Sequence, residues 1–66
     1  MKVFVRIRGT KKEIRIRKDA KLLDLLKKIK INPDGIIALV KDLPVPIDTI
    51  LENEDEIELL FVASGG

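Results

Sequence analysis

The chain has 66 residues, of which 36% are charged, and its formal net charge is only +2. Folding at about this length buries only about 60% of the surface that the unfolded chain exposes, so we expect a single small domain. The sequence contains neither cysteine nor histidine. Their absence excludes disulfides, thiolate and imidazole metal sites, and Cys–His or Ser–His–Asp catalysis.

The remaining composition indicates a globular protein with an aliphatic core. The apolar residues are nearly all Ile, Leu and Val, and the abundance of Lys, Arg and Glu without any Gln is typical of hot-growing sources. No apolar run approaches the roughly 20 residues of a membrane span, and the first residues form a strand pattern rather than a signal peptide. We therefore expect a cytoplasmic protein, from a thermophile, without a membrane partner.

The first two segments predict an antiparallel hairpin. Residues 1–8 and 13–17 alternate between apolar and polar side chains, as half-buried strands do, and residues 9–12 supply the turn. The expected inward side chains are Val3, Val5, Ile7, Ile14 and Ile16.

The hydrophobic period then changes to that of a helix. Asp19 is the expected N-cap, and an apolar stripe with i, i+3, i+4, i+7 spacing follows it. The stripe consists of Leu22, Leu25, Leu26 and Ile29. This pattern predicts about three turns of helix packed on the sheet, ended by the turn residues 32–35.

Three further segments complete the predicted sheet. Residues 36–40 form an uninterrupted apolar run, read as a buried strand whose facing alternation cannot settle. Residues 43–46 contain two prolines and so form an edge strand or an extended loop. Residues 56–62 alternate again as the last strand. We expect Ile57, Leu59 and Phe61 to point inward, and Ile47, Ile50 and Leu51 to close the bottom of the core.

These elements predict an α+β domain over residues 1–62, with one helix and a sheet as two layers around one core. Residues 63–66 follow as a flexible tail. The acidic residues Glu52, Glu54, Asp55 and Glu56 could hold a cation, but a solvated turn is the favoured interpretation, so no metal is expected.

The outward face of the sheet is a candidate partner-binding surface. The cations Lys2, Arg6, Arg8, Arg15 and Arg17 are expected to surround Phe4 there, with Leu60, Val62 and Glu58 contributed by the last strand. An apolar centre with a charged rim is typical of protein interfaces, although scattered surface apolar residues are also normal. RNA is the weaker alternative, because Phe4 is the only stacking aromatic on this face. The predicted partner-binding residues are Phe4, Arg6, Arg8, Arg15, Leu60, Val62, Ala63 and Ser64.

The sequence ends in Gly65-Gly66. A terminal carboxylate with no side chain near it can thread a narrow channel and reach a partner enzyme's active site, although a frayed end or an expression remnant also leaves glycines. Because no internal catalytic constellation can be built, this carboxylate is the candidate reactive group. The chain is then the co-substrate of another enzyme rather than an enzyme itself.

Several segments resemble a known family. Residues 1–6 read like the first strand of ubiquitin, while residues 43–52, 54–59 and 62–66 resemble the sulfur carriers of molybdopterin and thiamin synthesis. They are equally similar to the archaeal ubiquitin-like small modifiers and the ubiquitin-related tRNA-thiolation modifier. One departure is Glu54-Asp55, where that family usually has Gly-Asp, and this bears on the geometry of the turn.

The resemblance implies a β-grasp fold whose first and last strands lie parallel at the centre of a mixed sheet. It also implies that an E1-like adenylating enzyme, using ATP, converts the Gly66 carboxylate to an acyl-adenylate. A thiocarboxylate for cofactor or tRNA sulfur transfer follows, or alternatively an isopeptide-linked conjugate; a non-reactive interaction domain is the third interpretation. The five residues after Phe61 span about 16 Å when extended, enough to enter a buried site. No bound cofactor is expected, and the carrier is expected to be a monomer.

Overall fold

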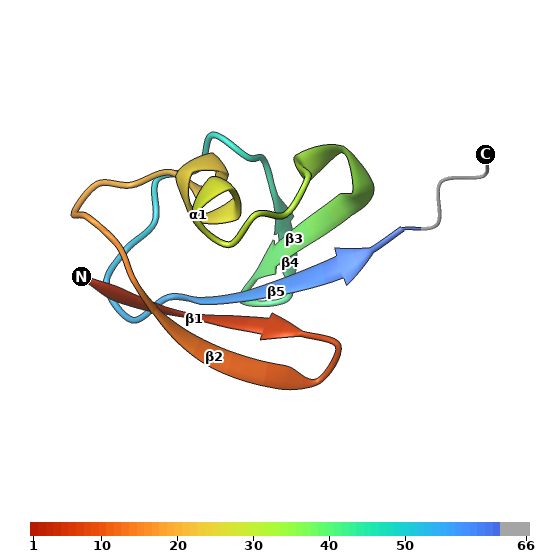
Figure 1. The fold of residues 1–66 in the computed structure, drawn as a ribbon, viewed down its shortest axis with the longest axis horizontal. Coiled ribbons are helices and arrows are strands. Elements are labelled where there is room, and N and C mark those ends of the chain that lie inside the picture. The colour runs from red at the N-terminus through yellow and green to blue at the C-terminus, as the bar shows by residue number, and fades with distance from the viewer. Residues whose placement is uncertain (63–66) are drawn as a thin grey trace.

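Five strands form one mixed sheet in the computed structural model, which describes residues 1–62 (Figure 1). The strands are β1 (Lys2–Ile7), β2 (Thr10–Arg15), β3 (Ile36–Val40), β4 (Leu43–Val45) and β5 (Glu56–Phe61), and their order in the sheet is β2-β1-β5-β3-β4. β1 pairs antiparallel with β2 and parallel with β5, while β3 pairs antiparallel with both β5 and β4. The first and last strands therefore lie side by side inside the sheet, and the predicted α+β class is confirmed. The predicted tail, residues 63–66, lies outside the described residues.

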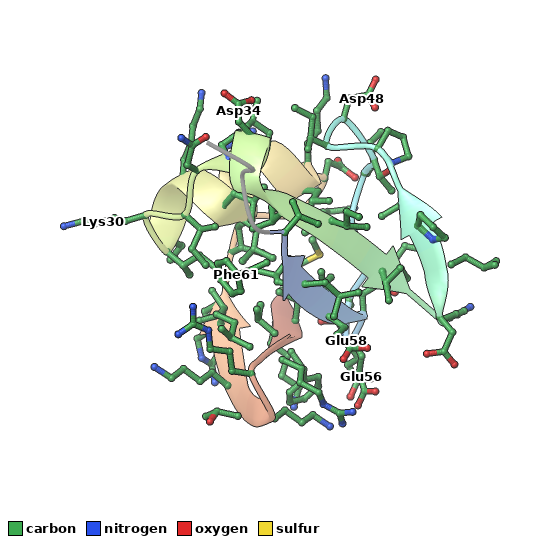
Figure 2. All side chains as sticks on the ribbon, turned by 90° about the vertical axis from the view of Figure 1, so that its right-hand side faces the viewer. Lys30, Asp34, Asp48, Glu56, Glu58 and Phe61 are labelled. Carbon is green, nitrogen blue, oxygen red and sulfur yellow. The ribbon has the colours of Figure 1, made fainter. Side chains whose placement is uncertain are left out.

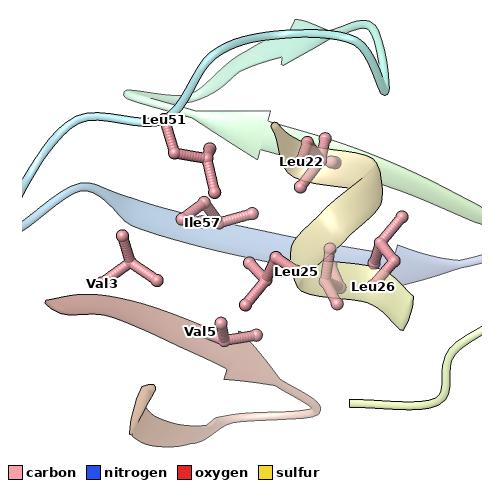
Figure 3. Packing of buried hydrophobic residues seen from close by; sticks show 9 residues of the cluster. Val3, Val5, Leu22, Leu25, Leu26, Leu51 and Ile57 are labelled. Carbon is pink, nitrogen blue, oxygen red and sulfur yellow. The ribbon is translucent and has the colours of Figure 1, made fainter. Parts of the chain in front are cut away.

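One face of the sheet is covered by the helix α1 (Leu22–Lys28), and the core lies between them (Figure 3). The core residues are at most 3% exposed: Val3, Val5, Leu22, Leu25, Leu26, Ala38, Leu51, Ile57 and Leu59. Fully burying an aliphatic side chain of this size contributes about 1.5–3 kcal/mol, so this set is the main stabilising element of so small a domain. Ala38 settles the facing of β3, because its neighbour on β5 is the buried Leu59.

The helix begins later than predicted, and its cap is not Asp19. Residues 20–21 stay extended because Lys21 bridges Ile50 and the carbonyl of Ala20 accepts a hydrogen bond from the Leu51 N–H. Asp19 itself lies in the preceding turn with a φ of 64°. The N-cap is therefore Lys21, and α1 has seven residues rather than about three turns.

Asp24 caps the helix from inside its first turn. Its Oδ2 accepts a hydrogen bond from the Lys21 N–H at 2.9 Å and a second from Arg17 Nη2 at 3.0 Å. The backbone hydrogen bond and the nearby positive charges, that of Arg17 first among them, lower the pKa of the Asp24 carboxyl below its ordinary value. A carboxylate at this position also complements the positive end of the helix dipole.

The segment 47–50 supports the helix through its main chain rather than its side chains. The carbonyls of Thr49 and Ile47 accept hydrogen bonds from the N–H groups of Leu22 and Leu23, at 2.9 and 2.8 Å. These are amides that the first turn of a helix leaves without internal partners. The prediction that Ile47 and Ile50 close the core is therefore wrong: both side chains are exposed, and from this segment only the following Leu51 is buried.

The helix ends in a Schellman motif. The Ile31 N–H donates to the Leu26 carbonyl at 2.9 Å and the Lys30 N–H donates to the Lys27 carbonyl at 3.2 Å, with Lys30 in the left-handed region at a φ of 61°. A short 3₁₀ turn, η1 (Pro33–Gly35), then leads into β3, as the turn residues predicted.

The strand ends also differ from expectation in two places. The β1–β2 connection is a two-residue turn at Arg8 and Gly9, both with positive φ, which matches the twist of the flanking strands and lets β2 start at Thr10. Phe61 lies on the same side of β5 as the buried Ile57, but it is 42% exposed rather than buried. β4 is an edge strand, which is one of the two alternatives predicted for residues 43–46. In the described part of the chain, no helix has the length and apolar character to cross a membrane.

Candidate partner-binding surface

The open face of the sheet, the face away from α1, carries the residues that alternate with the core. Strand register places three groups there: Phe4 and Arg6 on β1 with Lys11, Glu13 and Arg15 on β2; Glu56, Glu58 and Leu60 on β5; Ile37 and Leu39 on β3. Figure 2 shows Glu56 and Glu58 together on one side of β5 and Phe61 on the other. The open face is therefore charged over β2 and β1 and apolar over β3 and the end of β5.

The apolar part is a group of four residues, Ile37, Leu39, Leu60 and Val62. Leu60 and Ile37 lie opposite each other in the β5–β3 pair, and each is 42% exposed. Val62 is also exposed, and its N–H donates to the Gly35 carbonyl at 3.1 Å, which anchors the chain just past the end of β5. The predicted residues Leu60 and Val62 therefore lie together. Ile37 and Leu39 were missed, because an uninterrupted apolar run gives no alternation from which to read a face.

Phe4 is not the open apolar centre that was predicted. Its side chain is half-buried, and the Nζ atoms of Lys2 and Lys11 lie 5.8 and 4.9 Å from the centre of its ring. Cations at these distances are attracted to the face of the ring. Phe4 pairs in register with Glu56, and Leu60 is four residues farther along β5, about 13 Å at the rise of a strand. The structure therefore separates Phe4 from Leu60 and Val62.

An ion pair ties the charged part of the open face together. Lys11 Nζ donates to Glu56 Oε1 at 2.5 Å, and this hydrogen bond, with the charge of Lys11, lowers the pKa of the Glu56 carboxyl below its ordinary value. Beside the pair is a hollow of about 150 Å³ whose lining includes Phe4 and Leu39. The charged residues that line it are Arg6, Lys11 and Lys41 together with Asp42, Glu56 and Glu58. Because both signs are equally represented, the hollow suits a polar partner surface without selecting one charge.

The predicted arginines occupy three different settings. Arg15 is exposed, and the carboxylate that it approaches, that of Glu13, lies 4.0 Å away, so its charge is available to a partner. Arg8 lies at the β1–β2 turn with its guanidinium carbon 5.0 Å from the centre of the Phe61 ring. Arg17, expected on the open face, instead forms its ion pair with Asp24 of the helix. That expectation was wrong: Arg17 lies past the end of β2, and its guanidinium reaches the Asp24 carboxylate of the helix.

The acidic turn before β5 satisfies its own backbone. Asp55 Oδ2 accepts a hydrogen bond from the Glu52 N–H at 2.8 Å, and Asn53 Oδ1 accepts one from the Lys2 N–H at 3.0 Å. Among residues 1–62, no three side chains of metal-ligating type come together. These hydrogen bonds support the interpretation of a solvated structural turn. The candidate site is therefore a surface rather than a pocket with chemistry of its own.

Comparison with known proteins places the chain in a family. The sequence profile of small archaeal modifier protein 2 matches residues 1–62. The chain belongs to this family. Among curated proteins, none matches the sequence.

Solved structures similar to this small archaeal modifier confirm the β-grasp, ubiquitin-like fold. SAMP1 from Haloferax volcanii superimposes with a TM-score of 0.78 at 16% identity, with 100% of both chains covered. Caldiarchaeum subterraneum ubiquitin gives 0.76 at 18% identity, with 100% of this chain and 98% of that chain covered. ATBAG1, solved in complex with HSP70, gives 0.76 at 14% identity; the match covers 97% of this chain and 41% of the ATBAG1 chain. At these identities the likeness shows the fold alone.

Proposed function

We propose that this modifier is a protein substrate whose Gly66 carboxylate is activated by an ATP-dependent, E1-like adenylating enzyme. The observation that carries the proposal is the family match over residues 1–62, followed in the sequence by Ala63-Ser64-Gly65-Gly66. The exposed Leu60 and Val62 lie immediately before these four residues. When the enzyme binds the open face, residues 63–66 are therefore brought to the enzyme as well.

The chemistry needs no reactive side chain in the modifier. A carboxylate is a poor acyl donor, so an oxygen of the Gly66 carboxylate attacks the α-phosphorus of ATP and displaces pyrophosphate, which gives an acyl-adenylate. Glycine at positions 65 and 66 allows a channel too narrow for side chains to admit the tail. The modifier contributes binding energy and positioning, and the partner enzyme supplies ATP and catalysis.

The first proposed fate of the adenylate is sulfur transfer. A sulfide nucleophile attacks the Gly66 carbonyl carbon and displaces AMP, which leaves a thiocarboxylate for a cofactor or a tRNA. To test it, the full chain is incubated with the adenylating enzyme of its own source, ATP and hydrosulfide, and its intact mass is measured. Replacement of one oxygen by sulfur at Gly66, dependent on ATP, supports the proposal. If the enzyme preparation activates the chain but the mass of the chain does not change, the result contradicts sulfur transfer.

The second proposed fate is conjugation, which the family name favours because it describes a modifier. A lysine ε-amine of a target protein displaces AMP, directly or after transfer to an enzyme thiol, and an isopeptide bond forms with loss of a proton. Tagged modifier expressed in its source should then give conjugates of higher mass whose digested peptides carry the modifier's terminal residues on lysine. Thiocarboxylate without such peptides identifies a sulfur carrier alone. If neither the thiocarboxylate nor the conjugates are found, the result supports the third interpretation, a non-reactive interaction domain.

A further inference from the structure

We propose that Arg8, whose guanidinium lies over the Phe61 ring where the chain leaves the sheet, is a specificity residue that binds a carboxylate of the adenylating enzyme at the entrance of its channel. The inference rests on the proposed function and deepens it. The contact that Arg8 makes lies off the open face, and it requires a carboxylate on the partner enzyme.

The fold fixes Arg8 beside the end of β5. Arg8 occupies the two-residue turn between β1 and β2 with a φ of 50°, and Gly9 follows with a φ of 84°. Because β1 and β5 are parallel neighbours, their C-terminal ends lie side by side at the same end of the sheet (Figure 1). Phe61 is the last residue of β5, and Val62 is anchored to Gly35 directly after it. Arg8 is therefore next to the point from which the four residues 63–66 depart.

The Phe61 ring holds the guanidinium of Arg8 through a cation–π contact. The guanidinium carbon lies 5.0 Å from the centre of the ring, within the range of a cation–π interaction. Phe61 is 42% exposed. The N–H donors of a guanidinium lie in its plane, in a fork that matches a carboxylate. Among the described residues, the ion pairs are Lys11–Glu56, Arg15–Glu13 and Arg17–Asp24, and none involves Arg8.

An arginine that lies over an aromatic ring and outside these ion pairs suits a planar anion. A carboxylate accepts two parallel N–H bonds from a guanidinium, which adds direction as well as charge complementarity. The anion is not a phosphate of ATP, because the four residues from 63 to 66 span about 13 Å when extended and ATP meets the chain at Gly66. An arginine side chain at the root of the tail reaches the channel entrance instead. The expected partner group is thus an aspartate or glutamate of the enzyme at that entrance.

The test is steady-state ATP–pyrophosphate exchange by the adenylating enzyme, with the modifier as the varied substrate. Arg8→Ala should raise the KM for the modifier by roughly tenfold, as expected for the loss of a charge-assisted contact, and leave kcat nearly unchanged. Arg8→Lys keeps the charge without the planar fork and should recover only part of that loss. Lys18→Ala is the control for charge, because Lys18 is exposed in the turn before α1 and takes part in none of the ion pairs named above; its KM should change by less than twofold.

Phe61 variants test the stack itself. Phe61→Tyr keeps a ring under the guanidinium and should leave KM near that of the unaltered chain, whereas Phe61→Leu should raise KM although Arg8 keeps its charge. Thermal unfolding of each variant identifies a merely structural role: a lowered midpoint with unchanged KM overturns the inference. Equal losses for Arg8→Ala and Lys18→Ala also overturn it, since they indicate general electrostatic steering. An unchanged KM for Arg8→Ala overturns the inference, even if that variant binds RNA less well than the unaltered chain. If the unaltered chain supports no exchange, the proposed function fails first and the inference with it.

Discussion

Leu60 of β5 lies directly opposite Ile37 of β3, and both side chains are 42% exposed on the open face. Leu60 is two residues before Val62, the last residue that the structure describes. Apolar anchors that a partner buries carry much of the affinity of an interface. The apolar group formed by Ile37, Leu39, Leu60 and Val62, rather than Phe4, is thus the expected centre of docking.

Leu60→Arg should raise the KM for the modifier in adenylation by at least about tenfold, because the partner must then desolvate a charge where it buried a methyl group. The fold should be retained, since the side chain is exposed in the free protein. Leu43→Arg is the matched control: Leu43 is 66% exposed on the edge strand β4, and its variant should behave like the unaltered chain. Equal effects of the two substitutions would place docking elsewhere.

The order of the elements and most of the core could be predicted from the sequence, because strict alternation in residues 1–8 and the helical stripe each identify one buried face. Three features depend on which side chains the fold brings together, and hydrophobic periodicity does not contain that information. The β3–β5 register places Ile37 on the open face. Arg17 forms an ion pair with Asp24 of the helix. The ammonium groups of two lysines lie near the ring of Phe4. The late start of α1 has the same origin, since the carbonyls of segment 47–50 take the place of a side-chain cap.

Lys30→Gly should stabilise the protein. Lys30 occupies the left-handed position of the Schellman motif at a φ of 61°, where glycine is preferred because it has no Cβ. We expect the free energy of unfolding in urea to rise by about 0.5–1 kcal/mol. Lys30→Ala is the control, because it removes the same charge and retains the Cβ; it should give no gain. A gain of equal size from both variants would assign the effect to charge instead.

Glu54→Gly tests the one departure from the family pattern. Glu54 has a φ of 67°, so the turn keeps a backbone shape suited to glycine although a glutamate occupies it. Its N–H donates to the Lys2 carbonyl at 2.7 Å, and this bond does not depend on the side chain. The substitution should therefore raise the free energy of unfolding by about 0.5–1 kcal/mol. A loss of stability would show that the Glu54 side chain itself holds the turn.

Acid should weaken the fold through Asp24 and Glu56. Hydrogen bonds from the Lys21 N–H and from Lys11 lower the pKa of these carboxyls in the folded state. A lowered folded pKa means that the stabilisation is present above the unfolded pKa values of about 4 and is lost as the pH falls through the folded values. The unfolding midpoint should therefore decrease below about pH 4. In the double variant Asp24→Asn, Glu56→Gln this decrease should be smaller, and an identical pH profile would contradict the assignment.

In the proposed function, the Gly66 carboxylate is the group that the partner enzyme activates. ATP–pyrophosphate exchange is measured with the full chain and with a chain lacking Gly65 and Gly66. The full chain should support exchange, whereas the shortened chain should support none and should instead inhibit competitively through its intact open face. Exchange at equal rates with both chains would contradict the claim, because it would show that activation does not occur at Gly66.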